Sequence, residues 1–382
     1  MNIINFLPAL KHSNFRLFWA GQLISLTGTW MHQMAQGWLV YRMTDSPFYL
    51  GLAGTAASAP ILLFTLAGGV LADRHPRRKI LISAHLILLL LTLTLTLLTY
   101  YEQLTVWHIL ILGFLIGTVH AFEIPARQAF LIDMVGPDNL LNAIALNSTA
   151  FHAARMIGPA IAGLLIVQFG PALCFFINTL SFSAFIFALA TMRLPHKAVS
   201  SAEKIGIKQS LRQDISYIYH NKEVYPLLLL VGTMSFFGFP YISFLPVYAQ
   251  DILQTGPTGL GTLMGFAGAG AFTGAVLLSF RGGSTRKGLI MAGAGITFSI
   301  ALIIFSISKL TWLSYTMLFF IGFGAINQIA TVNSIIQLSV PDEMRGRVMS
   351  AFTTMFLGMA PLGNFTLGSL AHFTGTRTAL TT

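Results

Sequence analysis

The chain has 382 residues, of which 55% are hydrophobic and only 9% are charged, and its formal net charge is +10. A soluble domain carries about 25% charged residues, which cover its surface. This composition therefore excludes an ordinary soluble protein and indicates a chain that lies mostly within lipid.

Stretches long enough to cross a bilayer follow one another along the chain. A spanning helix needs about 20 mostly apolar residues, and we expect eleven of them, at residues 15–42, 47–72, 80–101, 106–132, 140–169, 171–193, 225–250, 257–280, 287–308, 311–339 and 346–373. The predicted fold class is all-α, a polytopic membrane protein. The second half ends after its fifth span, so we expect a twelfth to be missing through truncation.

The basic residues of the loops predict the orientation in the membrane. Cytoplasmic loops retain Lys and Arg, and placing the N-terminus in the cytoplasm leaves only Arg42, Lys309 and Arg377 among the loop cations outside. The positive net charge is therefore an orientation signal. It does not indicate nucleic acid binding, because the aromatic residues lie in apolar spans rather than on a basic soluble face.

The longest polar stretch divides the spans into two sets. We predict an N-terminal six-helix bundle at residues 1–194, a cytoplasmic linker at 195–223 and a C-terminal bundle with five spans at 224–382. Apolar linker residues recur at helical spacing among basic ones, which predicts an amphipathic helix on the inner leaflet. These residues are Ile207, Leu211, Ile215, Ile218 and Tyr219.

The two sets of spans also resemble each other, as in transporters built from internal repeats. Gly117 and Pro137 in the first half match Gly322 and Pro341 in the second, at offsets of 205 and 204 residues. A nearly constant offset at both positions predicts a duplication.

The loop after the second span carries the most specific motif. Its sequence Gly69-Val-Leu-Ala-Asp73-Arg74-His-Pro-Arg77-Arg78-Lys79 resembles the G-x-L-a-D-R-x-x-R-R-K loop of the major facilitator superfamily. The resemblance implies that Gly69, Asp73, Arg74, Arg77 and Arg78 form a gating loop, which holds one face closed and opens during transport. The alternative is that the basic residues only anchor the span ends.

Other segments resemble one branch of that superfamily, the enterobactin-exporter-like transporters. They include Phe15-Arg-Leu-Phe-Trp-Ala-Gly-Gln22, Pro125-Ala-Arg-Gln-Ala129 and Leu245-Pro-Val-Tyr248, and the resemblance extends from Phe15 to about Gly375. It implies the major facilitator fold, with two pseudo-symmetric bundles that work by alternating access, in a monomer of the bacterial cytoplasmic (inner) membrane.

The fourth span contains the one carboxylate that lies well inside a predicted span, Glu123. Arg127 follows four residues later, on the same face of a helix. Ionisable groups at membrane depth cost about 2.5–3.5 kcal/mol on insertion scales, so they are functional candidates. We expect Glu123, Arg127 and His152 of the fifth span to take part in proton coupling; the alternative for Glu123 and Arg127 is a permanent structural ion pair.

Uncharged polar residues inside spans are candidates for contact with substrate, because lipid leaves them without hydrogen bonds. An equally simple alternative is hydrogen bonding between helices. With Arg155 in the fifth span, the candidates for the cavity are Gln22, Trp30, Gln33, Gln36, Arg155, Asn327, Gln328, Asn333 and Asn364.

Small residues and a proline in the fifth span resemble the motif associated with antiporters of the superfamily. Gly158, Pro159 and Gly163 allow a close approach of helices and bend the span. This resemblance implies export rather than uptake.

Together these features predict a secondary transporter that exports a small amphipathic molecule, such as a siderophore, in exchange for protons. The alternatives are a multidrug or lysolipid transporter, or a non-transporting membrane receptor or scaffold with the same fold. We expect neither enzymatic activity nor a cofactor or metal, because the sequence has no P-loop lysine motif, no His-Glu-x-x-His cluster and a single cysteine, Cys174.

Overall fold

The computed structural model describes residues 7–193, 217–280 and 286–381, and all regular structure in these ranges is helical. After a short helix, η2 (Pro8–Lys11), the first half comprises α1 (Ser13–Thr44), α2 (Pro47–Arg74), α3 (Arg77–Tyr100), α4 (Val106–Val135), α5 (Leu140–Phe169) and α6 (Pro171–Thr191). The second half comprises α8 (Val224–Thr233), η3 (Met234–Gly238), α9 (Tyr241–Val247), η4 (Tyr248–Ile252), α10 (Gly256–Phe280), α11 (Lys287–Ile307), α12 (Thr311–Ser339), α13 (Asp342–Thr374) and α14 (Thr376–Thr381).

Every predicted span falls on a helix, which confirms the all-α membrane fold class. Within the described ranges, nine helices are long and apolar enough to cross a membrane. The long helices α1 and α13 are not among these nine. Polar residues such as Gln22, His32, Gln33 and Gln36 make α1 less apolar than its neighbours.

The seventh span is divided into four consecutive segments that include two π-helical turns, η3 and η4. The backbone N–H of Phe239 donates to the Met234 carbonyl (3.1 Å), and that of Leu253 donates to the Tyr248 carbonyl (2.8 Å), five residues back in each case. Pro240 and Pro246 lack the N–H that an α-helix needs. π-turns are frequent at functional sites, and this span borders the cavity described below.

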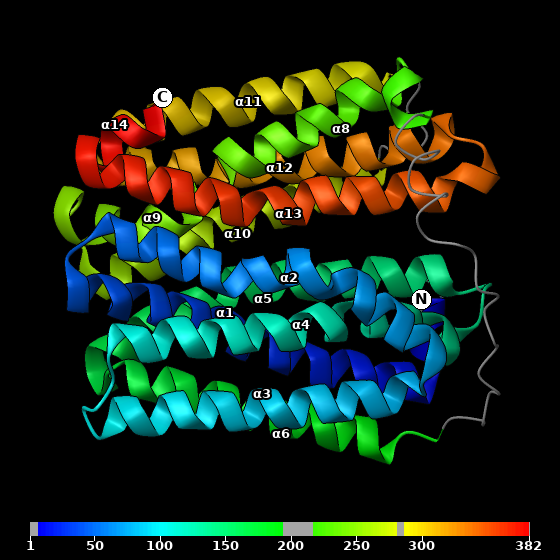
Figure 1. Cartoon of the computed structure of the whole chain (residues 1–382), viewed down its shortest axis with the longest axis horizontal. Coiled ribbons are helices and arrows are strands. Elements are labelled where there is room, and N and C mark those ends of the chain that lie inside the picture. The colour runs from blue at the N-terminus through cyan, green and yellow to red at the C-terminus, as the bar shows by residue number, and fades with distance from the viewer. Residues whose placement is uncertain (1–6, 194–216, 281–285, 382) are drawn as a thin grey trace, which may run out of the picture.

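The two halves lie one above the other in Figure 1 and meet along two helix pairs. α5 packs against α10, and α2 packs against α13. Within each half the second helix packs on the fourth, as α2 on α4 and α10 on α12, and the third packs on the fourth. The short helix α14 packs against α11 as α6 packs against α3. The same pairing scheme therefore organises both halves.

The ends of the bundle differ in charge. We call the end where α1 begins and α2 ends the basic end, because it carries Arg16, Arg74, Arg77, Arg78 and Lys79. The opposite end carries the α1–α2 and α3–α4 connections and α14 (Figure 1).

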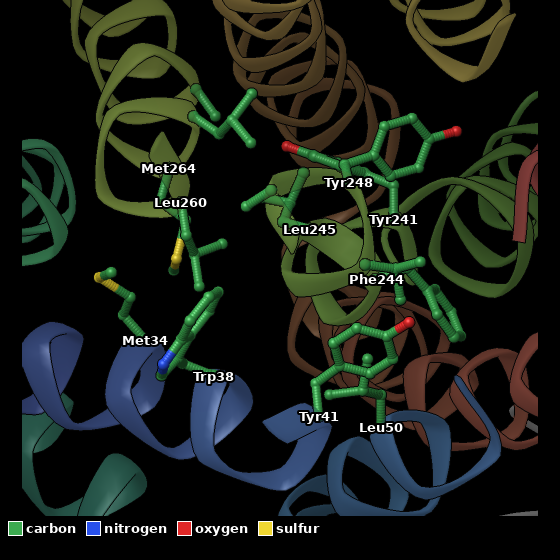
Figure 2. Packing of buried hydrophobic residues seen from close by; sticks show 14 of the residues in the cluster. Met34, Trp38, Tyr41, Leu50, Tyr241, Phe244, Leu245, Tyr248, Leu260 and Met264 are labelled. Carbon is green, nitrogen blue, oxygen red and sulfur yellow. The ribbon is translucent and has the colours of Figure 1, made fainter. Parts of the chain in front are cut away.

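A buried hydrophobic cluster joins the halves toward the opposite end. In Figure 2, Tyr41 of α1 lies beside Phe244 of α9, and Trp38 of α1 lies beside Leu260 and Met264 of α10. The Tyr41 hydroxyl donates a hydrogen bond to Asp251 of η4. This end of the molecule is therefore closed by packing between the halves.

The contacts of α2 with α13 gather toward the same end. The Thr55 hydroxyl donates to the Pro361 carbonyl (3.0 Å), and Phe48 packs edge-on against Phe365, with 6.3 Å between ring centroids. One predicted feature, the amphipathic linker helix, falls largely outside the described residues: of its apolar positions only Ile218 and Tyr219 are described, as part of a helical turn at 217–220.

Candidate functional site

A cavity of about 320 Å³ lies between the halves, next to the buried cluster. Its walls come mainly from α1, α2 and α4, with contributions from α3, α6, α9 and α10. Both polar and apolar side chains line it, and its described lining includes no Asp, Glu, Lys or Arg. The polar members are Thr29, His32, Gln33, Gln36, Ser58, Thr92, His120, Asn178 and Ser243.

One face of α1 supplies four of these polar groups, Thr29, His32, Gln33 and Gln36. His32 Nε2 and Gln36 Oε1 are 2.9 Å apart, one helical turn along, and Gln33 lies between them in sequence. The His32 ring packs edge-on against Phe175 of α6, with 5.0 Å between centroids. The structure therefore places the predicted Gln33 and Gln36 in the cavity wall.

Three ionisable residues on α4 form a row behind the cavity. Glu123 is only 3% exposed, and its Oε1 lies 2.7 Å from Arg127 Nε. Its other oxygen, Oε2, lies 3.7 Å from Nδ1 of His120, which lines the cavity. A helix brings these groups together because residues three and four apart share a face.

A second, smaller pocket of about 220 Å³ lies on the other side of this row, between α4 and α5. It is lined by Arg127, Gln128, Asn147, Ser148, Phe151 and His152. His152 is 7% exposed, and neither its Nδ1 nor Asn147 Oδ1 has a hydrogen-bond partner among the described residues. The predicted His152 is thus near Arg127 but separate from the main cavity.

The centre of α5 carries Arg155, which faces the other half of the molecule. Its guanidinium lies over the Trp30 ring, 5.4 Å from the centroid, and it reaches the Tyr241 hydroxyl of α9. Trp30 also packs edge-on against Phe151, with 5.6 Å between centroids. Arg155 therefore lies where α1, α5 and α9 converge.

The remaining predicted polar residues lie away from the lining of the main cavity. Gln22 is 2% exposed, and neither amide atom has a partner among the residues described. Asn327 donates to the Phe323 carbonyl (2.8 Å), and Asn333 accepts from Gln337 (2.6 Å).

Two more of these amides lie at packed helix contacts. Gln328 is 7% exposed beside Gly295 of α11. Asn364 accepts from the Ser243 hydroxyl (3.0 Å) at the contact between the halves.

Several lining residues were not predicted. Thr29, Ser58, Thr92, Asn178 and Ser243 all border the cavity. Their only signal in the sequence is a small polar side chain within an apolar span. That signal is weak, because a hydroxyl in a helix can bond its own backbone, as Thr92 bonds the Leu88 carbonyl (2.9 Å).

Comparisons with known proteins agree with this architecture. The family model described as a transmembrane secretion effector, of the major facilitator type, matches residues 4–382. The chain belongs to this family. It is 27% identical to macrolide efflux protein A of Streptococcus pyogenes, over 92% of this chain and 89% of that protein.

Two further relatives are named for siderophores. The chain is 26% identical to the staphyloferrin A transporter of Staphylococcus aureus, with 94% of this chain and 90% of that protein covered. It is 23% identical to the enterobactin exporter of Escherichia coli, with 96% and 88% covered. Among solved structures, the D-xylose–proton symporter superposes with a TM-score of 0.72 at 12% identity, covering 95% of this chain and 94% of that one. The expected superfamily is confirmed: the chain is a multi-pass transporter with efflux-type relatives, not an enzyme.

The major facilitator loop lies at the basic end, and its basic residues contact two other helices. Arg77 donates to Asp133 Oδ2 and to the Ala129 carbonyl of α4, both at 2.9 Å, and Arg78 donates to the Ala190 carbonyl of α6 (2.7 Å). Asp73 and Arg74 are exposed, and neither forms an ion pair with another described residue. Gly69 has open space around its Cα.

The motif at Gly158, Pro159 and Gly163 lies where α5 packs against α1 and α10. A Cβ on Gly163 would lie 2.8 Å from the Pro257 carbonyl oxygen of α10, and one on Gly158 would lie 2.8 Å from the Thr27 carbonyl oxygen of α1. Both glycines therefore permit contacts that no larger residue allows without displacing a helix.

Proposed function

We propose that this transporter exports small amphipathic molecules from the bacterial cytoplasm in exchange for protons. The observation that carries the proposal is the buried Glu123, which contacts Arg127 on one side and the cavity-lining His120 on the other. A carboxylate at this depth is expensive, and here it adjoins the space that substrate would occupy.

Alternating access fits the distribution of contacts between the halves. Basic loops favour the cytoplasmic side, so the basic end would face the cytoplasm, with the N-terminus. The halves are packed together at the opposite end by Tyr41, Asp251 and the surrounding cluster. In this assignment the structure represents a state closed toward the outside, and export requires that packing to open.

In this proposal, proton coupling arises because Arg127 and a proton compete for the Glu123 carboxylate. Arg127 stabilises the carboxylate at 2.7 Å. Because both residues belong to α4, a side-chain rearrangement that turns Arg127 away from Glu123 would favour protonation of the carboxylate. His120 lies between Glu123 and the cavity, so substrate binding beside His120 would alter the same equilibrium. His152, in the pocket on the far side of Arg127, is a second proton-binding candidate.

The loop at Gly69–Lys79 would control the cytoplasmic face. Asp73 and Arg74 are exposed in the present state, which suits a loop that is released when the halves part at the basic end. We further propose that residues 1–194 and 224–382 move as two bundles within a monomer, joined by the linker at 195–223.

The choice of substrate class draws on the cavity and on the relatives. Polar amides and hydroxyls interspersed with Met34, Leu50 and Phe182 suit a molecule with both polar and apolar parts. Relatives are named for macrolides, staphyloferrin A and enterobactin. A siderophore is therefore the first substrate to test, and macrolides are the second.

The test is proton movement in proteoliposomes on addition of catecholate siderophores, carboxylate siderophores, macrolides and a lysolipid. We expect one class to evoke a proton flux that Glu123→Gln abolishes. The matched control is Glu102→Gln, at an exposed position between α3 and α4, which should retain the flux. Flux that persists in Glu123→Gln would remove Glu123 from the mechanism, and silence for every compound would favour a receptor or scaffold.

A further inference from the structure

The charges in the middle of α4 and α5 do not balance. Glu123 and Arg127 neutralise each other at 2.7 Å, which leaves Arg155 with its positive charge. No Asp or Glu among the described residues pairs with Arg155. The mid-span region of the first half therefore carries one uncompensated positive charge.

The position of Arg155 makes this imbalance costly. Fifteen residues precede it in α5 and fourteen follow it, so it lies at the middle of the span, where a charged side chain is least favourable. Its contacts, the Trp30 ring and the Tyr241 hydroxyl, are the kind that orient a guanidinium without neutralising it. Arg155 is half-buried, and charges withdrawn from water are normally paired in proteins.

The surroundings of Arg155 are suited to a ligand. The polar pocket begins one turn along α5 at His152, where the side chain is 7% exposed and Nδ1 has no partner among the described residues. Phe151 lines this pocket and contacts Trp30, which lies under Arg155. Polar groups, aromatic rings and the free charge are thus contiguous.

We propose that the exported molecule carries a carboxylate, and that this carboxylate is the missing counter-ion of Arg155. A planar guanidinium binds a carboxylate through two parallel hydrogen bonds. The Tyr241 hydroxyl, from the other half, donates to the same group, so the bound carboxylate links the two halves.

This inference rests on the proposed transport function but can fail separately, because its test is binding rather than transport. The purified full-length protein in detergent is heated with citrate, with a citrate-based carboxylate siderophore, and with a cationic macrolide. We expect the carboxylate siderophore to raise the melting temperature of the wild-type protein, and Arg155→Gln to weaken its binding by about tenfold or more.

Two variants provide the controls. Arg42→Gln removes an arginine that also lies over a tryptophan, Trp38 at 6.0 Å, but at the exposed end of α1, and it should bind like wild type. Arg155→Lys keeps the charge but not the paired hydrogen bonds, so it should bind more weakly than wild type and more tightly than Arg155→Gln.

The melting temperatures of the ligand-free proteins distinguish a ligand-binding role of Arg155 from a structural one. If Arg155 is an unpaired charge kept for a ligand, Arg155→Gln melts at the same temperature as wild type or higher. If Arg155 instead holds Trp30 and Tyr241 in place, the variant melts lower and the inference is wrong. Stabilisation by the macrolide alone, or equal stabilisation of wild type and Arg155→Gln by the siderophore, would also overturn it.

Discussion

The close contact of α5 with α10 predicts how one added methyl group redistributes the conformations. In Gly163→Ala the new Cβ would lie 2.8 Å from the Pro257 carbonyl oxygen and 3.1 Å from Thr258 Cα, whereas ordinary contacts begin at 3.4 Å. The helices must therefore separate by about 0.6 Å. Overpacking of this kind costs about 1–3 kcal/mol.

This cost applies only to the state in which the halves are packed at the opposite end. It therefore shifts the equilibrium toward the state that is open there, by about 5-fold to 150-fold. Gly265→Ala is the matched control on the same interface, because its Cβ would lie 3.4 Å from the Met156 carbonyl oxygen, an ordinary contact.

Distances between spin labels measure the shift. Labelled cysteines at Met43 and Leu310, which are 41% and 53% exposed, would report the distance across the opposite end. Labelled cysteines at Leu141 and Leu338, which are 83% and 72% exposed, would report the distance across the basic end. The native Cys174 is buried, so it leaves introduced cysteines free for labelling.

In Gly163→Ala we expect longer distances between Met43 and Leu310 and shorter ones between Leu141 and Leu338. If both distributions match those of Gly265→Ala, the α5–α10 contact does not control the equilibrium and the reasoning is refuted.

Two further contacts can be tested by substitution. Tyr41→Phe removes the hydrogen bond to Asp251, a charged acceptor, and should weaken closure of the opposite end by about 1.5–3 kcal/mol; the Met43–Leu310 distance checks this, and an unchanged distribution would contradict it. Arg77→Gln breaks the 2.9 Å ion pair with Asp133, whose side chains are 27% and 23% exposed. Because such a pair is partly screened, it should cost only about 1 kcal/mol or less, seen as a small decrease in melting temperature; unfolding of the variant would show that this loop contact matters more.

The helices and one ion pair were predictable from the sequence because each depends on local spacing. Apolar windows placed every span, and the four-residue spacing of Glu123 and Arg127 predicted their contact. The rotation of each helix was not predictable, since lipid is as apolar as the protein interior and hydrophobicity does not distinguish the two faces. Gln36 of α1 therefore lines the cavity, whereas Asn327 of α12 bonds its own backbone.

Gly117 and Gly322, which the sequence offset relates, lie at equivalent helix contacts in the two halves. A Cβ on Gly117 of α4 would lie 3.0 Å from the carbonyl carbon of Ala57 on α2, and one on Gly322 of α12 would lie 2.9 Å from that of Ala267 on α10. In both halves the fourth helix thus approaches the second at a glycine. The offset of 205 residues relates equivalent positions in the fold.

The same offset places Gln328 at the position equivalent to Glu123. Both side chains are buried, at 7% and 3% exposure, on the fourth helix of their half. The amide is nearly the same size as the carboxylate and carries no charge, and Val332 stands where Arg127 would be. A neutral side chain therefore fills the equivalent buried position in the second half. A carboxylate is not needed there for structure, which is the strongest reason to look for the role of Glu123 in transport.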